Sequence, residues 1–357
     1  MSAMCACGGS GGFASIVADA GGTSDPGVTD AGLADAGTAD DCTGIVPAVP
    51  ASASAFDIGA SGGQSCSVAL TDSSGVMAAE SHTGTASGAA AQVDWHEFDA
   101  RGISAGSFTG GVSLSPQAVG FLGLQGNAGA LSFDWWNGSG TLKNLTPVGD
   151  GTFAITIATG FPSGAIVVRN TSNNVLVQSF DANANLVNSV PIATTSAVLA
   201  AAQDRSDLPA GQGFAQAGVL VVLANGQGVW VDLVAGSSGT PFAIGTGATA
   251  IARALIGGGV AVRFDGRWTT AVSTSNTLSP PPPWLTDGSD FVISRGGIAY
   301  AVITPGSNVI PLAVGRTTCG SITLQGATSV SVGIEGTVIG SSGSGGCGKI
   351  FWSKLLQ

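Results

Sequence analysis

The chain has 357 residues, of which 57 are glycine, 44% are hydrophobic and only 9% are charged. Its net charge is −11, Lys and Arg are not clustered, and no stretch of about 20 apolar residues occurs, which excludes a nucleic-acid-binding protein and a membrane-spanning helix. A helical protein needs more Leu, Glu, Lys and Arg, whereas abundant glycine, β-branched residues and turn formers favour short strands joined by tight turns. The composition therefore predicts an all-β protein.

The first 42 residues are acidic and show no apolar periodicity. They contain six aspartates and no Lys or Arg, and three Asp-Ala-Gly units recur among Ala, Gly and Thr. A segment with charges of one sign and few apolar residues stays extended and solvated. We therefore expect a disordered tether over residues 1–42 and a folded domain over residues 43–357.

Two cysteines lie near the start, in the stretch Met-Cys-Ala-Cys-Gly-Gly at 4–9. The basic and apolar regions of a signal peptide are missing before them. The stretch nevertheless resembles the cleavage end of a bacterial lipoprotein signal, which implies that Cys7 is the lipidated residue, with Cys5 as the second candidate. A glycine-rich start with two incidental thiols is the alternative. The Ala/Asp/Gly tether that follows is similar to the linkers of myxobacterial-type surface lipoproteins.

The other four cysteines fall into two pairs along the chain, Cys42 with Cys66 and Cys319 with Cys347. None belongs to a CxxC motif and neither histidine is close to the later pair, so no metal site is predicted. The simplest interpretation is two disulfides, Cys42–Cys66 and Cys319–Cys347, which need an oxidising compartment and so predict export. Four reduced thiols in a cytosolic protein are the alternative.

From residue 43 onward, units of strand, turn and strand recur. Two clear copies run over 165–192 and 219–244, and the second has strands at 219–224, 229–234 and 240–244. Further copies are expected at 120–136 and 291–314, the latter with a strand at 309–314. An apolar residue followed by Asp ends several of the strands, as at Phe98-Asp99, Phe133-Asp134, Phe180-Asp181 and Val231-Asp232. We expect these aspartates to accept backbone N–H groups in the following turn and therefore to be structural.

The spacing of the turns indicates the architecture. Turn centres are on average about 45 residues apart, and residues 43–357 hold seven such units, each as long as a four-stranded propeller blade. We therefore expect a β-propeller of seven blades, each with four antiparallel strands, in which a last strand over 348–356 pairs with a strand from the other terminus. Six or eight blades, a pair of β-sandwiches or a β-helix are the alternatives. The whole pattern resembles bacterial surface lipoproteins with a seven-bladed β-propeller domain.

Few residues are candidates for binding. In the predicted strand 93–99, alternation places Asp94 and His96 on one face, where they can meet a ligand together. Trp136, next to Trp135, is a candidate for stacking on a sugar or contacting a protein. A solvated strand face and core packing are the respective alternatives. No catalytic residue, metal or cofactor is predicted.

These features predict an exported binding or scaffold module at the outer membrane surface, in the periplasm or outside the cell. Its partner would be a protein or a glycan, and it would meet the membrane only through the lipid anchor. A propeller-fold hydrolase or lyase with a site at the central channel is one alternative, and a structural component of an envelope or extracellular assembly is another. The chain has only two histidines, which favours binding over catalysis.

Overall fold

The computed structural model describes residues 42–47, 166–181, 185–205, 218–272, 276–293 and 298–324 with their side chains, and elsewhere only the backbone of strands between 54 and 165 and between 329 and 354. The chain divides into two units, Met1–Ala34 and Asp35–Gln357, and every described residue belongs to the second. The described residues form strands and turns and no helix. The prediction of an all-β protein is confirmed.

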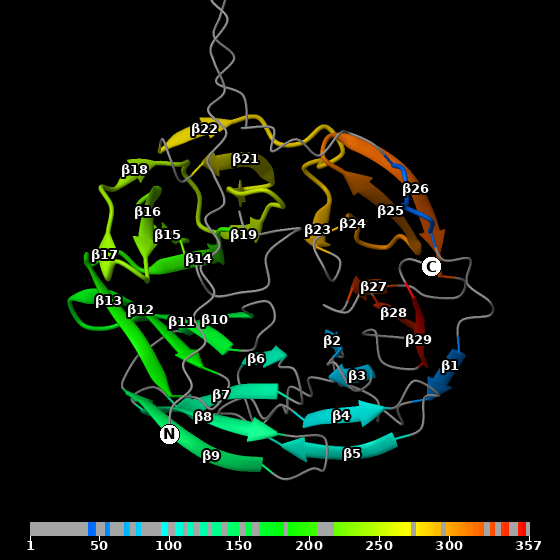
Figure 1. Ribbon diagram of the computed structural model, residues 1–357, viewed down its shortest axis with the longest axis horizontal. Coiled ribbons are helices and arrows are strands. Elements are labelled where there is room, and N and C mark those ends of the chain that lie inside the picture. The colour runs from blue at the N-terminus through cyan, green and yellow to red at the C-terminus, as the bar shows by residue number, and fades with distance from the viewer. Residues whose placement is uncertain are drawn as a thin grey trace, which may run out of the picture. The chain divides into compact units, whose positions relative to one another are not determined.

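The described strands form seven antiparallel sheets (Figure 1). Sheets 1 to 3 are β2 (Val68–Thr71), β3 (Val76–Ala79), β4 (Asp94–Phe98) and β5 (Ser104–Thr109); β6 (Ser113–Pro116), β7 (Phe121–Asn127), β8 (Ala130–Trp136) and β9 (Leu142–Gly149); and β10 (Ala154–Ala158), β11 (Gly164–Asn170), β12 (Asn174–Asp181) and β13 (Leu186–Ala193).

Sheets 4 to 6 follow the same order. They are β14 (Val198–Gln203), β15 (Gly218–Leu223) and β16 (Gln227–Asp232), with β17 (Ser237–Ser238) and β18 (Phe242–Ala243) both beside β16; β19 (Ala250–Ala254), β20 (Val260–Phe264), β21 (Arg267–Val272) and β22 (Thr277–Ser279); and β23 (Asp290–Ile293), β24 (Tyr300–Ile303), β25 (Val309–Val314) and β26 (Thr317–Thr323). In Figure 1 the first strands β10, β14, β19 and β23 lie toward the inside, and the fourth strands β13, β17, β22 and β26 toward the outside.

Sheet 7 combines strands from both ends of the described chain. Its order is β1 (Ser54–Asp57), β29 (Lys349–Lys354), β28 (Thr337–Ser342) and β27 (Ser329–Val332). The strand predicted over 348–356 is present as β29, and it pairs with β1 by four residue pairs. The repeated four-stranded antiparallel sheets make the arrangement propeller-like. None of the described residues belongs to a helix that is long and apolar enough to cross a membrane.

The copy predicted over 219–244 lies in sheet 4. It begins with β15 and β16, joined by a tight turn in which Gly226 has a φ of +83° and a Cβ would clash with the Gly245 carbonyl oxygen, so only glycine fits. The third strand predicted at 240–244 is instead two short strands, β17 and β18, that both pair with β16. Pro241 lies between them, and its missing N–H explains the interruption.

Two of the aspartates that end strands form the predicted turn contacts. The Asp232 carboxylate accepts hydrogen bonds from the backbone N–H groups of Val234 (2.9 Å) and Ala235 (2.8 Å). The Asp181 carboxylate accepts from the backbone N–H of Asn185 (2.8 Å) and from its side-chain amide (3.0 Å). These carboxylates are therefore structural. The side chains of Asp99 and Asp134 lie outside the described residues.

Neighbouring sheets pack face to face through aliphatic side chains. In β15, Val219, Val221 and Leu223 belong to the core shared with sheet 3. The alternate residues, Leu220 and Val222, belong to the core shared with sheet 5. All five are at most 1% exposed, and burial of each stabilises the fold by about 1.5–3 kcal/mol. The almost continuous apolar sequence of this strand is thus explained by burial on both faces.

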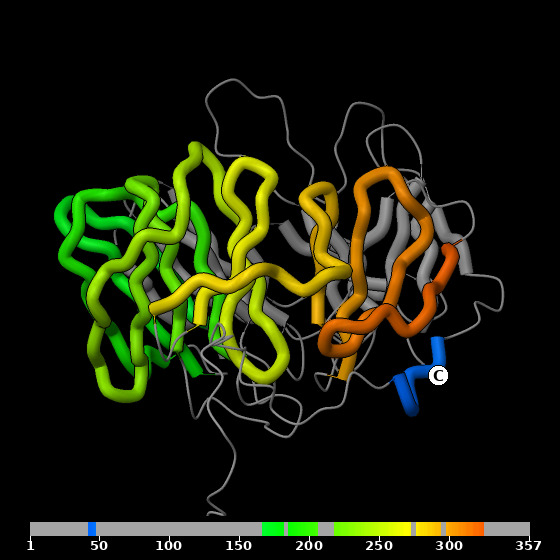
Figure 2. The backbone as a smooth tube through the Cα atoms, turned by 90° about the horizontal axis from the view of Figure 1, so that it is seen from above, coloured from blue at the N-terminus to red at the C-terminus, as the bar shows by residue number. Residues whose placement is uncertain are grey.

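An aromatic cluster fills the space between sheets 5 and 6. The Phe291 ring, which is fully buried, lies 5.4 Å from Trp284 and 5.4 Å from Tyr300 between centroids, with both pairs close to perpendicular. Trp268 of β21 lies 5.9 Å away on the sheet 5 side. Trp284 comes from the proline-rich connection between β22 and β23, which Figure 2 shows crossing from one sheet to the next. Edge-to-face pairs of this kind add to the energy of area burial.

Candidate functional site

The predicted ligand-binding residues lie on third strands. Asp94 and His96 belong to β4 of sheet 1, and Trp136 ends β8 of sheet 2. β4 and β8 are each the third strand of their sheet, and the second strand separates them from the first strand. The side chains of these residues, like Cys7, lie outside the described residues. Their roles in ligand binding and lipidation stay predictions.

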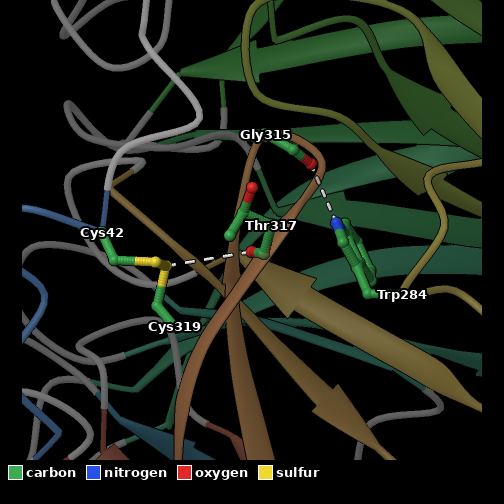
Figure 3. Close-up of a disulfide and its surroundings, with 5 residues drawn as sticks. All are labelled: Cys42, Trp284, Gly315, Thr317 and Cys319. Atoms are coloured by element: carbon green, nitrogen blue, oxygen red, sulfur yellow. Dashed lines mark hydrogen bonds between the residues drawn. A yellow bond between two sulfur atoms is a disulfide. The ribbon is translucent and has the colours of Figure 1, made fainter.

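The predicted pairing of the disulfides is wrong. Cys42 is bonded to Cys319, with the two Cα atoms 5.2 Å apart (Figure 3), so neither Cys42–Cys66 nor Cys319–Cys347 forms. The prediction paired cysteines that are close in the sequence. The partner of Cys42 instead depends on the position of residues 42–47, which lie against the edge of sheet 6. Cys66 and Cys347 lie outside the described residues. The bond still indicates an oxidising environment and therefore export.

Cys319 occupies a β-bulge in β26. Leu312 of β25 pairs with Gly320 and Ala313 pairs with Thr318, so the register leaves Cys319 without a partner on β25. Gly320 has a φ of +120°, which glycine adopts easily. A bulge re-aims a side chain and ends regular pairing locally. The bulge thus gives this edge strand a half-buried cysteine that bonds to a segment outside the sheet.

Residues 42–47 lie against this bulge. The backbone N–H of Ile45 donates to the Cys42 carbonyl (2.9 Å) across Gly44, whose φ is +86°. Ile45 is buried in the core formed by sheet 6, and a Cβ on Gly320 would lie only 3.1 Å from Pro47 Cγ. Residues 42–47 are therefore fixed to sheet 6 by one covalent bond and two packing contacts, and this junction is the candidate functional site.

Two described contacts lie on either side of the turn that leads to Cys319. The Cys319 Sγ lies 3.8 Å from the Thr317 carbonyl oxygen (Figure 3), a van der Waals contact because a bonded sulfur carries no proton. On the other side of the β25–β26 turn, Trp284 Nε1 donates to the Gly315 carbonyl oxygen at 2.8 Å. These contacts hold the turn and the bulge in place.

A second set of polar contacts links sheets 4, 5 and 6. The turn between β19 and β20 is held on both sides: the Gly259 N–H donates to Asp204 Oδ1 of sheet 4 (3.2 Å), and the Ile256 N–H donates to the Tyr300 hydroxyl of sheet 6 (2.7 Å). Three successive glycines, Gly257 to Gly259, have positive φ and allow the turn. Asp204 and Tyr300 are buried, so both contacts are structural links between sheets.

Tyr300 should resist ionisation while the protein is folded. Burial raises the pKa of its hydroxyl well above the ordinary value of about 10, and the hydrogen bond from Ile256 offsets this only in part. The folded protein binds this proton more tightly than the unfolded chain, so the associated stability is complete below about pH 10 and declines as the pH rises further. Tyr300 is the one tyrosine in the chain. Tyrosinate absorbance should therefore appear only together with loss of tryptophan fluorescence, and its appearance in folded protein near pH 10 would contradict the prediction.

An ion pair also joins sheets 5 and 6. Arg253 of β19 donates from Nε and Nη2 to the two carboxylate oxygens of Asp290 of β23, at 3.0 and 2.7 Å. Both side chains are partly exposed, which limits the gain from such a pair. We expect a double-mutant cycle with Arg253→Ala and Asp290→Ala to give a coupling energy of about 0.5–1 kcal/mol. The coupling should fall in high salt, and a coupling that salt does not change would rule out an electrostatic origin.

Among the described residues, no group of three or more His, Cys, Asp or Glu side chains is placed to hold a metal ion. No known protein family matches the sequence, and no curated protein is significantly similar to it.

Sequence reasoning missed the pairing of Cys42 with Cys319. One signal was available, because the glycine that follows Cys319 within a strand indicates a bulge.

Proposed function

We propose that the chain is an exported β-propeller of seven blades that acts as a binding or scaffold module at the cell surface, displayed on its N-terminal tether. The observation that carries this proposal is the Cys42–Cys319 disulfide. Such bonds persist in oxidising compartments, and this one joins the end of the acidic tether to the outer strand of sheet 6. A covalent junction of this kind suits a domain that is held at a distance from an anchor.

Sheet topology supports the seven blades. Seven antiparallel sheets follow one another in chain order, and β1 and β29 combine the two ends in sheet 7. The inner strand β2 of sheet 1 contacts β27 of sheet 7, as a closed ring requires. Each sheet would then be one blade, and the pairing of β1 with β29 would close the ring.

Binding is favoured over catalysis by the structural roles of four of the six described carboxylates. Asp181 and Asp232 hold turns, Asp204 links two sheets and Asp290 pairs with Arg253. We propose that the partner is a protein or a glycan, that Asp94, His96 and Trp136 are its contacts, and that Cys7 carries the lipid.

Expression in cells tests export and lipidation, and a separate experiment on the purified chain tests binding. The chain is expressed with its native upstream region in a bacterium, and intact cells are treated with protease. We expect cleavage on intact cells, a mass at the N-terminus that shows a lipid on Cys7, and an oxidised Cys42–Cys319 pair. A chain found in the cytosol with free thiols would refute export.

Binding is tested on the purified chain with glycan and protein arrays. A ligand found there should lose affinity about tenfold or more on Trp136→Ala, by analogy with aromatic hot spots. The matched control is Leu278→Ala, an exposed residue of β22 that should leave affinity unchanged. Equal affinity of the Trp136 variant would remove that residue from the binding surface.

A further inference from the structure

We propose that the Cys42–Cys319 bond is a mechanical clasp: it carries tension from the tether into sheet 6 and keeps that tension away from β1. The proposal rests on the proposed function, because a displayed domain that binds a partner is pulled through its tether. It assigns to this bond a role beyond that of a stabilising cross-link.

The order of elements along the chain places the clasp before a short end strand. Cys42 precedes β1, which begins at Ser54. β1 is an end strand of sheet 7 and pairs only with β29, by four residue pairs. Without the bond, a pull on residues before 42 would reach β1 after detaching Ile45 and Pro47. An end strand of this length can be removed one hydrogen bond at a time.

With the bond in place, the same pull enters the fold at Cys319. This residue lies within β26, which pairs with β25 by six residue pairs. Ile322 of β26 and the next core residue, Leu324, are fully buried with Ile310 and Leu312 of β25. The load therefore meets a longer strand with a packed core behind it, and it does not reach β1.

The clasp matters because β1 completes sheet 7. β1 covers the edge of β29, the last strand of the chain, and it is the contribution of the N-terminal side to sheet 7. Its removal would expose the β29 edge and separate the two ends of the chain. An unpaired strand edge is also a template for pairing with other chains. Tension on a tether without the clasp would act at this point first.

Single-molecule pulling in two geometries tests the proposal. One enzymatic handle is placed in the exposed turn at 235–236 of sheet 4, and the other at the N-terminus or at the C-terminus. For the N-terminal geometry, we expect reduction with dithiothreitol to lower the first rupture force at least twofold. A new early step should appear, with a length of at most about 50 Å for the stretch from Cys42 to Asp57 at about 3.4 Å per residue.

The C-terminal geometry is the matched control. There the load enters through β29 whatever the state of the bond, so reduction should leave the first rupture force unchanged. The Cys42→Ser/Cys319→Ser variant should behave as the reduced protein in both geometries. If the variant does not fold, reduction of the folded wild-type chain still gives the result.

Two outcomes overturn the proposal. In the first, the oxidised and reduced proteins rupture at the same force when pulled from the N-terminus. In the second, reduction lowers the force equally in both geometries, which would show that the bond does not direct the load from the tether. Neither outcome depends on where the protein is located in the cell, so failure here is distinguishable from failure of the proposed function.

Discussion

The Cys319→Ser variant is expected to lose about 3–5 kcal/mol of unfolding free energy relative to the wild-type chain. The bond joins residues separated by 277 positions, and the entropy that a cross-link removes from the unfolded chain grows with the length of the loop it closes. The chain-entropy relation gives about 5.6 kcal/mol for a loop of this length, and strain or residual structure reduces the measured value. The effect is measured by urea unfolding followed by tryptophan fluorescence.

The matched variants are Cys42→Ser and the reduced wild-type chain. Both lack the same bond, so their unfolding midpoints should fall to that of Cys319→Ser within experimental error. An oxidised wild-type chain whose midpoint does not change on reduction would show that the bond contributes no stability. A variant at Cys42 that stays as stable as the wild type would lead to the same conclusion.

Replacing Phe291 with Ala is expected to cost about 3–5 kcal/mol. The ring is fully buried between sheets 5 and 6 and contacts the rings of Trp268, Trp284 and Tyr300. Truncation removes the apolar surface and leaves a cavity that β-sheet backbones on both sides cannot fill by moving. The variant should unfold at lower urea concentration, and the near-ultraviolet circular dichroism of the tryptophans should weaken.

Leu278→Ala provides the control for Phe291→Ala. Leu278 lies on β22 and is 43% exposed, so its truncation should change the unfolding free energy by no more than about 0.5 kcal/mol. Similar losses in the two variants would show that the aromatic cluster is not a tightly packed part of the core.

Local features of the fold could be predicted from the sequence because they depend on neighbours in the chain. The strands predicted at 219–224 and 309–314 occur as β15 (Gly218–Leu223) and β25 (Val309–Val314). Their apolar runs are bounded by glycine and polar turn residues, and each is long enough to pair. The capping role of Asp232 follows from the same local chemistry, since an Asp side chain reaches backbone N–H groups two or three residues ahead.

Features that depend on distant segments could not be predicted in the same way. The partner of Cys42 is 277 positions away, and the links from Asp204 to Gly259 and from Tyr300 to Ile256 join different sheets. The periodicity of the sequence does not indicate which residues of different sheets come into contact. The candidate ligand residues Asp94 and His96 were placed correctly on a strand, β4, while their role in binding stays a prediction.

The pairing of β1 with β29 also sets an order of assembly. Ser54–Asp57 precedes and Lys349–Lys354 follows all the strands of the other six sheets in the chain, so sheet 7 stays incomplete until those six sheets have been translated. Pairing across such a sequence separation is slow, because a long loop must close first. Once the Cys42–Cys319 bond has formed, the loop that must close to pair β1 with β29 runs only through Cys42 to Ser54 and Cys319 to Lys349, so its closure costs less entropy.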